Sequence, residues 1–494
     1  MDKITVKNRC FVDQYGRERI FNGINVVDKG TFNGTSRSFS RSWTDSKCEK
    51  FRAHGFELMR LGFTWEAVEP EPGVYNDEYL ESVRTMLDMC EQNGVYVFLD
   101  MHQDLYSGFG DGPGDGAPAW ATLTGKYKYK KPRFVWAEGY FWGRAVHTAF
   151  DDFWANAVVN GRGLQDWYAD MWAHVAAVLG DHPAVIGFDM LNEPFPGKDG
   201  GKVFRSIVAS AVRVVLADSE FHTLKLIKDA CGKQPVPKVL SHITPGIMKK
   251  VTSPANKLIY KFDTERYSPF LNKTAASIRR EDKDGIFMVE NSYFSNTGIP
   301  FSAPPITVGG KRDAKQAFAP HAYDMMVDTP MYKYASNDRV GAMFAEHKRS
   351  QERLGVPVVV GEWGGNSVGT EWLPHVAFIL ELFDLNQWSH TYWHYFEAMF
   401  ETPLMGVLCR PHPVAVTGRI LSYKHDRNAD TFELRYEQNG EYAAPTELYL
   451  HKNAKAVTVD GKKGKVKIEK LAGSEAASVY VATGKGVHTV RVEF

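Results

Sequence analysis

Eight short apolar runs recur along the first four-fifths of the chain, and stretches with a helical spacing of apolar residues separate most of them. The runs are rich in β-branched residues and are bounded by Gly, Pro or polar residues, as buried parallel strands are. They span residues 21–27, 56–61, 95–101, 185–191, 285–289, 317–321, 356–361 and 389–393. The helical patterns span residues 44–54, 77–93, 164–179, 203–216, 338–354 and 374–386. This alternation predicts an α/β fold, a (β/α)8 TIM barrel rather than a doubly wound sheet.

Most of the predicted strands end in polar or aromatic residues. These residues are Asn25, Lys29, Arg60, His102, Asp104, Asn192, Glu193, Asn291, His321, Tyr323, Glu362 and Trp393. A barrel gathers the carboxyl ends of all its strands at one mouth, whereas a doubly wound sheet concentrates such groups at its switch point. We therefore expect one site at the barrel mouth.

The sequence pattern changes toward the end of the chain, where short alternating strands and Gly or Asn turns replace the βα pattern. We predict a barrel domain over residues 1–408 and an antiparallel β-sandwich over residues 409–494, joined by a linker of sequence Arg-Pro-His-Pro. Its predicted strands span residues 431–436, 447–451, 455–459, 465–469, 478–482 and 488–492. The sandwich either binds carbohydrate or packs on the barrel for stability.

Two connections of the barrel are long, at residues 106–163 and 194–284. Both follow strands, so both are expected over the barrel mouth as walls or lids, and the alternative is that they only stabilise the barrel. A glycine-rich run at residues 110–116 reads as a mobile loop of this mouth.

The charge and cysteine content narrow the possible partners and the compartment. Of 494 residues, 59 are basic and 59 acidic, which provides no electrostatic footprint for nucleic acid and no polybasic stripe for a membrane surface. Five cysteines without a C-x-x-C pair indicate neither a disulfide framework nor a zinc site. No signal-peptide core and no membrane-spanning apolar run is found. We expect a soluble monomer, cytoplasmic if Met1 is the native start and otherwise secreted with its signal peptide removed.

Two glutamates carry the chemistry that the pattern predicts. Glu193 ends the fourth predicted strand and Glu362 ends the seventh, so the two carboxyl groups would face each other across the barrel mouth. A pair placed in this way is typical of a glycosidase that uses one carboxyl group as acid/base and the other as nucleophile. The alternative for either glutamate is a structural salt bridge.

The neighbours of the two glutamates fit this chemistry. Asn192 could bind a sugar hydroxyl, and His321 and Tyr323 enter beside Glu362 from the sixth strand, where they could hold it ionised. Arg60 could pair with Glu362 and lower its pKa, or form a structural ion pair. His102 and Asp104 suit hydrogen bonds to sugar hydroxyls.

Other reaction types find little support in the sequence. A G-x-S-x-G pattern contains Ser367, but this serine lies five residues beyond the strand that ends at Glu362, whereas serine hydrolases need it on the turn directly after a strand. The chain contains no H-E-x-x-H zinc motif and no G-x-G-x-x-G or Walker loop. We therefore expect neither a cofactor nor a metal.

At these residues the chain resembles glycoside hydrolase family 5 of clan A. Asn192-Glu193-Pro194 is similar to its acid/base motif, Gly361-Glu362-Trp363 to its nucleophile motif, and His321-Ala-Tyr323 to its sixth-strand pair. Arg60, His102 and Trp393 match the remaining usual positions. Within the family, the segments 25–29, 100–107, 115–120, 150–154 and 191–197 resemble endoglycoceramidases and related glycosphingolipid hydrolases.

The resemblance implies retaining hydrolysis of the β-glycosidic bond between a glycan and ceramide. Lys29, Asp104 and Trp154 would contact the sugar, Trp393 would line the site, and apolar residues at the mouth would take the lipid. Two features depart from these relatives: the segment 194–284 is longer, and Glu290-Asn-Ser292 follows strand five in place of a Glu-Pro-containing motif.

The departures leave alternatives open. A longer lid that leaves room for one sugar would give an exo-acting glucosylceramidase or a steryl-β-glucosidase. An endo-β-glycanase is disfavoured because open polysaccharide clefts rarely carry such large covering loops. A glycolipid-binding protein without activity is disfavoured because both glutamates are present. In each case the expected partner is a glycolipid, with transient contact with lipid assemblies.

Overall fold

A computed structural model of the chain describes residues 1–39, 43–133, 135–217, 228–229, 231–232, 238–239, 241–327, 329–365, 369–464 and 466–494. Ser367 of the G-x-S-x-G pattern and Lys465 of a predicted strand lie outside these described residues, as do parts of the predicted loop 194–284. Among the described helices, none is both long enough and apolar enough to cross a membrane.

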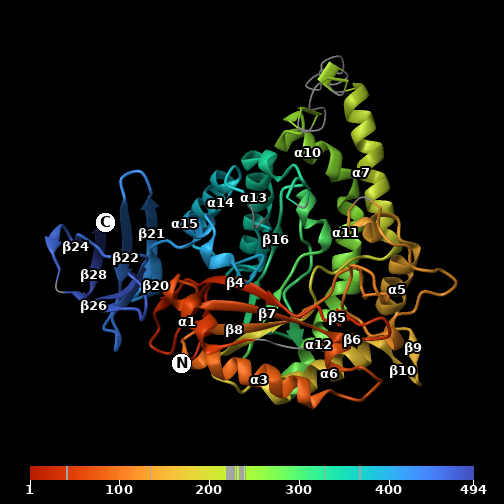
Figure 1. The fold of residues 1–494 in the computed structure, drawn as a ribbon, viewed down its shortest axis with the longest axis horizontal. Helices are drawn as coiled ribbons and strands as arrows, with labels where there is room; N and C mark the ends of the chain where they lie inside the picture. Colours follow the sequence, from red (N-terminus) through yellow and green to blue (C-terminus); the bar gives the residue numbers. More distant parts are fainter. Residues whose placement is uncertain are drawn as a thin grey trace.

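The centre of the molecule is a parallel eight-stranded barrel, as the sequence predicts (Figure 1). Its strands are β4 (Asn22–Val27), β7 (Leu58–Thr64), β8 (Tyr96–His102), β11 (Val185–Asp189), β12 (Ile286–Val289), β15 (Gln316–Phe318), β17 (Val359–Val360) and β19 (Ser389–Tyr392). The two ends of the sheet order are β15 and β17. A parallel bridge between Phe318, in β15, and Val358, next to β17, joins them and closes the barrel. Beyond it, β16 (His321–Ala322) pairs in parallel with β18 (Glu362–Trp363), so the sixth and seventh strand ends lie side by side.

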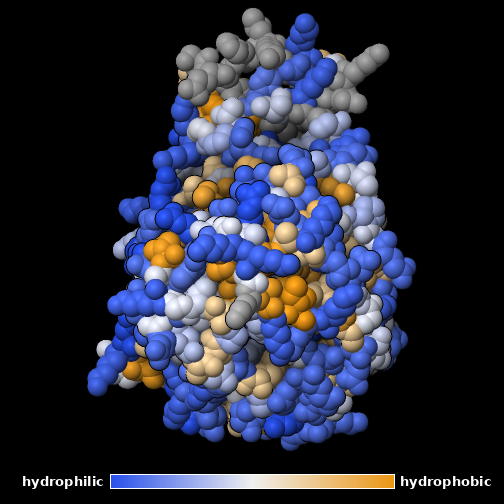
Figure 2. Space-filling view, turned by 90° about the vertical axis from the view of Figure 1, so that its left-hand side faces the viewer, coloured by the Kyte–Doolittle hydropathy of each residue, from blue (hydrophilic) through white to orange (hydrophobic). Residues whose placement is uncertain are grey.

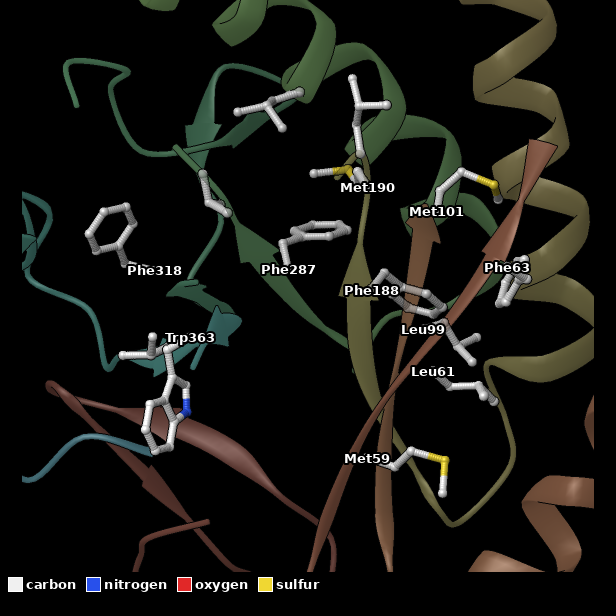
Figure 3. Packing of buried hydrophobic residues seen from close by; sticks show 14 of the residues in the cluster. Met59, Leu61, Phe63, Leu99, Met101, Phe188, Met190, Phe287, Phe318 and Trp363 are labelled. Carbon is white, nitrogen blue, oxygen red and sulfur yellow. The ribbon is translucent and has the colours of Figure 1, made fainter. Parts of the chain in front are cut away.

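Helices surround the barrel and bury the outward face of its strands. The main ones are α1 (Asp45–Ala53), α3 (Asp77–Gln92), α6 (Leu164–Leu179), α12 (Ser268–Glu281), α13 (Asn337–Leu354) and α14 (Leu373–Asn386). On β7, the side chains of Met59, Leu61 and Phe63 belong to the large core cluster between strands and helices (Figure 3). Phe63 contacts Trp172 of α6, with ring centroids 6.4 Å apart.

The inward face of the strands forms a second, smaller core that fills the lower part of the barrel. Leu58 of β7, Phe98 of β8 and Met288 of β12 belong to it. Ile4 and Phe11, from the N-terminal segment, join the same cluster and cover the bottom of the barrel. The lower part of the barrel interior is therefore a packed apolar core. Polar groups occupy the upper part, at the carboxyl ends of the strands.

The two long connections carry helices of their own. After β8 come α4 (Glu138–Trp142) and α5 (Arg144–Trp154). After β11 come α7 (Lys198–Ala217), α10 (Pro245–Thr252) and α11 (Asn256–Phe262). In Figure 1, α7 and α10 rise away from the barrel toward the top of the view.

The glycine-rich run at residues 110–116 is tied to the barrel in the structure. The guanidinium of Arg37 donates hydrogen bonds to the carbonyl oxygens of Gly110, Gly112 and Gly114 at 3.0–3.2 Å. Asp115, near the end of the run, is buried and bridges to Asp104. The loop is therefore anchored at both ends of its glycine repeat.

The C-terminal part of the chain is a sandwich of two antiparallel sheets. The first contains β20 (His412–Val416), β23 (Thr446–Leu450), β26 (Val466–Lys470) and β27 (Ala477–Val481). The second contains β21 (Arg419–Asp426), β22 (Thr431–Gln438), β24 (Ala456–Val459), β25 (Lys462–Lys463) and β28 (Gly486–Glu493). Apolar side chains from both sheets, Leu434 and Leu448 among them, form one core.

Three N-terminal strands complete the first of these sheets. They are β1 (Thr5–Lys7), β2 (Cys10–Val12) and β3 (Glu18–Arg19), and β3 pairs with β20. The predicted linker Arg-Pro-His-Pro is wrong, because Arg410 is buried and His412 begins β20. The domain boundary between residues 408 and 409 stays a prediction.

The molecular face that carries the C-terminal sandwich is predominantly hydrophilic, with hydrophobic residues in small and separate patches (Figure 2). Two exposed apolar side chains of the sandwich, Ile468 and Val487, are about half accessible.

Candidate active site

The polar centre of the barrel follows directly from the alternation of side chains along the strands. Residues two positions beyond Leu58, Phe98 and Met288 point into the barrel above the inner core. They are Arg60, Asp100 and Glu290, and all three are fully buried. A charge at such a position must be paired with another charge.

Arg60 provides that pairing for four carboxylates. Its guanidinium nitrogens lie 3.0 Å from Asp100, 3.0 Å from Asp189, 2.6 Å from Glu290 and 2.7 Å from Glu362. It also donates a hydrogen bond to the side-chain oxygen of Asn192 at 2.9 Å. The expected contact between Arg60 and Glu362 is present, within a larger cluster.

The two predicted catalytic glutamates come close together at the barrel mouth. One carboxylate oxygen of Glu193, one of Glu362 and one ring nitrogen of His321 all lie within 4.8 Å of one another. Retaining glycosidases hold their two carboxyl groups about 5–5.5 Å apart, and inverting ones about 6.5–9.5 Å. The observed spacing fits the retaining geometry.

His321 and Tyr323 surround Glu362 as the sequence predicts. Tyr323 Oη donates a hydrogen bond to Glu362 Oε2 at 2.9 Å, and His321 Nδ1 lies 3.6 Å from the same oxygen. His321 Nδ1 also lies 3.2 Å from Glu193 Oε1. Burial opposes protonation of His321, but Glu290 and Glu362 raise its pKa well above the ordinary value, so the imidazole is a cation among carboxylates.

The environment of Glu193 differs from that of Glu362. Arg60 and Tyr323 contact Glu362, whereas neither of these two residues contacts the Glu193 carboxyl among the described hydrogen bonds. Burial raises the pKa of Glu193 to about 7, against the opposing effect of His321. A carboxylic acid that keeps its proton near neutral pH can act as a general acid.

A polar subsite adjoins the glutamates. Lys29 forms an ion pair with Asp104 and lies 3.4 Å from Asp115 and 5.1 Å from the centre of the Trp393 ring. His102 stacks on Trp393 at 5.3 Å. Burial opposes protonation of His102, but its contact with Asp100 at 2.8 Å raises its pKa to about 10. Burial would raise the pKa of Asp104, but Lys29 lowers it to about 2.

Trp154, a predicted sugar contact, lies in an aromatic cluster of the structure. Its indole donates a hydrogen bond to the carbonyl oxygen of Phe195 at 2.7 Å, and its ring packs against Phe262 and Phe270. Neither Trp154 nor His321 is among the residues that line the cavity at the barrel mouth. The contact of Trp154 with the sugar stays a prediction.

The polar subsite opens into a cavity of about 650 Å³ at the barrel mouth. One part of its lining is polar and contains the groups already described, including both glutamates. The other part is apolar and is formed by Val135, Trp136, Ala137, Phe141, Phe204, Ile207, Tyr293, Phe294 and Met325. We call this second part the apolar wall, and Phe204 and Ile207 bring it from α7.

Several residues of this site are not among the predicted site residues. Asp100 and Asp189, which pair with Arg60, lie inside predicted apolar strands, and a charge in such a strand is the signal that marks them. Glu290 is predicted only as part of a segment that departs from relatives. The apolar wall had no comparable signal, because apolar residues at helical spacing usually belong to a core.

Two carboxylate clusters of the site have the composition of cation sites, but side chains of the protein neutralise them. Arg60 lies between Asp100, Asp189 and Glu290. Lys29 lies between Asp104 and Asp115.

Comparisons with known proteins agree with the geometry. Residues 13–398 match the model of the cellulase family, glycosyl hydrolase family 5, and residues 410–492 match the glycoside hydrolase family 5 C-terminal domain. A curated endoglycoceramidase of Hydra vulgaris is 29% identical over 220 residues, which cover 39% of this chain. The match spans about two fifths of that relative's own length (41%).

Two further comparisons extend over nearly the whole chain. Endoglycoceramidase I of Rhodococcus hoagii is 23% identical over 500 residues, which cover 97% of this chain and 86% of the relative. The solved structure of endo-glycoceramidase II from a Rhodococcus species in complex with a five-membered iminocyclitol aligns with a TM-score of 0.73 at 24% identity, covering 99% of both chains. At 24% identity, this structural similarity shows the fold alone.

Proposed function

The chain belongs to glycosyl hydrolase family 5, and from that premise we propose that it is a retaining β-glycosidase that hydrolyses the bond between glycan and ceramide in glycosphingolipids. The observation that carries the proposal is a single cavity that joins two close glutamates and a polar subsite to an apolar wall. A glycolipid has the same two-part character, and the curated relatives named above are endoglycoceramidases.

The first step divides the roles between the two glutamates. Glu362, as a carboxylate, attacks the anomeric carbon of the sugar, and Glu193 gives its proton to the glycosidic oxygen as the bond to the lipid breaks. The products are a covalent glycosyl ester on Glu362 and the free lipid alcohol. Glu193 is left as a carboxylate beside the His321 cation.

The second step returns the enzyme to its starting state. Glu193 takes a proton from water, the resulting hydroxide attacks the anomeric carbon, and the ester bond to Glu362 breaks. Two inversions at the same carbon give net retention. Glu193 is again protonated, and both atoms and charges balance.

The proton donor also fixes the direction in which the substrate lies. A general acid lies beside the leaving oxygen, so the lipid must extend from Glu193. One residue of the apolar wall, Tyr293, contacts Phe195, two residues after Glu193, so the wall adjoins Glu193 on that side. The sugar then occupies the subsite of Lys29, His102 and Trp393. This orientation supports a lipid as leaving group and disfavours an endo-β-glycanase.

Product analysis tests the proposal. Purified protein is incubated with glucosylceramide, lactosylceramide, a ganglioside and a steryl glucoside, and the products are identified by mass spectrometry. Release of an intact oligosaccharide together with ceramide is expected. If only glucosylceramide or the steryl glucoside is hydrolysed, and glucose is the only sugar released, the enzyme acts in the exo mode and the endo mode is contradicted. Absence of any hydrolysis would favour a binding protein without activity.

The nucleophile is tested by azide rescue. Glu362→Gly should be inactive on an aryl β-glycoside, and added azide should restore turnover and give the α-glycosyl azide, because azide enters the space of the missing carboxylate. Glu362→Gln serves as the matched control, since its amide fills that space. Activity in Glu362→Gly without azide would contradict the assignment.

A further inference from the structure

Glu290 occupies an unusual place between the backbone and the side chain of the proposed proton donor. It follows β12, is fully buried, and is not part of the cavity lining. Its Oε2 accepts a hydrogen bond from the backbone N–H of Glu193 at 2.6 Å. Its Oε1 accepts one from Arg60 at 2.6 Å and lies 3.1 Å from His321 Nε2. Glu290 therefore contacts the residues on which Glu193 depends without reaching the substrate.

The backbone contact supports an uncommon conformation. Glu193 has φ +39°, in the left-handed region that residues other than glycine rarely adopt. Its buried N–H would lack a partner without Glu290, which would cost free energy. On the other side of the same residue, Gln103 Nε2 donates hydrogen bonds to the carbonyl oxygens of Asn192 at 2.9 Å and Glu193 at 3.2 Å. The turn that aims Glu193 into the cavity is thus held from both sides.

The side-chain contact passes through His321. One ring nitrogen of His321 lies 3.2 Å from Glu193 Oε1, and the other lies 3.1 Å from Glu290 Oε1. Burial opposes ionisation of Glu290, but His321 and Arg60 lower its pKa to about 2, so it is an anion. Its negative charge favours the cationic form of His321, whose ring lies between Glu290 and Glu193.

From these contacts we propose that Glu290 is a positioning residue that aims the Glu193 carboxyl group at the glycosidic oxygen. The inference rests on the proposed role of Glu193 as general acid. In this role Glu290 acts on proton transfer by Glu193 and not on the attack by Glu362.

The test uses the dependence of the rate on the leaving group. A 2,4-dinitrophenol leaves without a proton, whereas a phenol needs one, so only the second reports on the general acid. The variant Glu290→Gln is compared with wild type on 2,4-dinitrophenyl and phenyl β-glycosides, as glucosides or lactosides according to which the wild type hydrolyses faster. We expect kcat/KM to fall about 100-fold for the phenyl glycoside and less than about tenfold for the dinitrophenyl glycoside.

Asp189→Asn is the matched control. Asp189 lies 3.0 Å from Arg60 Nε in the same buried cluster, and no described hydrogen bond joins it to Glu193. Burial and the nearby Glu290 raise its pKa well above the ordinary value, and the change to an amide keeps the size of the side chain. The ratio of the two rates should stay at its wild-type value in this variant.

An equal loss on both substrates in Glu290→Gln would overturn the inference, because it would indicate a general structural role. So would a ratio that changes as strongly in Asp189→Asn. If Glu290→Gln does not fold, Glu290→Asp gives the same comparison, since it keeps the charge but is one methylene shorter. A wild type that hydrolyses neither glucosides nor lactosides would overturn the proposed function itself, a result distinct from an equal loss in the variant.

Discussion

At the scale of single residues, the proposed roles of the two glutamates follow from their different surroundings. Arg60 and Tyr323 donate hydrogen bonds to the Glu362 carboxyl group, while burial raises the pKa of Glu193 to about 7. The same side chain can therefore attack at one position and donate a proton at the other.

The raised pKa of Glu193 predicts the pH dependence of the reaction. Glu193 must be protonated to act as acid, and the protonated fraction falls as the pH rises through about 7. We expect kcat/KM for a phenyl β-glycoside to decline above that pH. In Glu193→Gln the remaining activity should show no such decline. A wild-type profile that stays level to about pH 9 would contradict the prediction.

The phenol of Tyr323 provides a second prediction at this scale. Tyr323→Phe removes the hydrogen bond to Glu362 Oε2 and leaves the ring in place. A hydrogen bond to a charged group contributes about 1.5–3 kcal/mol, so we expect kcat/KM to fall by roughly 10- to 100-fold. Because Tyr323 acts on the nucleophile, the loss should be similar for good and poor leaving groups. A selective loss on the poor leaving group would contradict this role.

At the scale of elements, the sequence predicts the barrel well because each of its strands carries a local signal. All eight predicted runs overlap barrel strands, and all six predicted helices are present, α6 with the predicted bounds. The helix α12 is not among the predicted helices, although another helix, α7, is predicted in the same connection. Strands β1–β3 were missed because two or three residues are too few for a periodic pattern.

Site residues were predictable wherever a motif falls at a strand end, as at Glu193 and Glu362. The contacts among them were not, because pairing across a barrel depends on the register of strands far apart in the sequence. Arg60 illustrates this limit: its partner Glu362 was expected, whereas Asp100 and Asp189 become neighbours only through the closed sheet.

The apolar wall predicts how α7 contributes to substrate choice. Phe204→Ala removes an aromatic ring from the cavity lining, so we expect KM for a glycosphingolipid to rise about tenfold while kcat/KM for a soluble aryl glycoside stays near the wild-type value. Val208→Ala on the same helix is the control, since Val208 is 47% exposed and does not line the cavity. Equal effects on both substrates would contradict a role in lipid binding.

At the scale of the whole molecule, barrel and sandwich are joined by buried polar contacts. Arg410, which precedes β20, forms two hydrogen bonds with Asp384 of α14, one of them 2.7 Å long. His412 lies 3.0 Å from Glu57, at the start of the barrel. The sandwich is therefore bound to the barrel by buried polar pairs, and removal of one partner would leave the other buried without it.

This junction predicts a stability effect far from the active site. Arg410→Ala leaves the carboxylate of Asp384 buried without its partner, and we expect the free energy of unfolding to fall by about 3–5 kcal/mol in urea titrations. Arg419→Ala is the control, because Arg419 pairs with Glu437 at the surface and its loss should cost less than about 1 kcal/mol. A similar effect in both variants would contradict the role of the buried pair.

The strands β1–β3 have a consequence for how the protein is made. They are synthesised before the barrel, yet β3 pairs with β20, whose residues are synthesised about four hundred positions later. The first sheet of the sandwich is therefore completed only after the barrel has been synthesised, and its early strands must wait unpaired or paired with each other. A fragment that begins at residue 409 would lack three strands of that sheet, so the sandwich is better expressed with the whole chain than cut at the boundary that the sequence suggests.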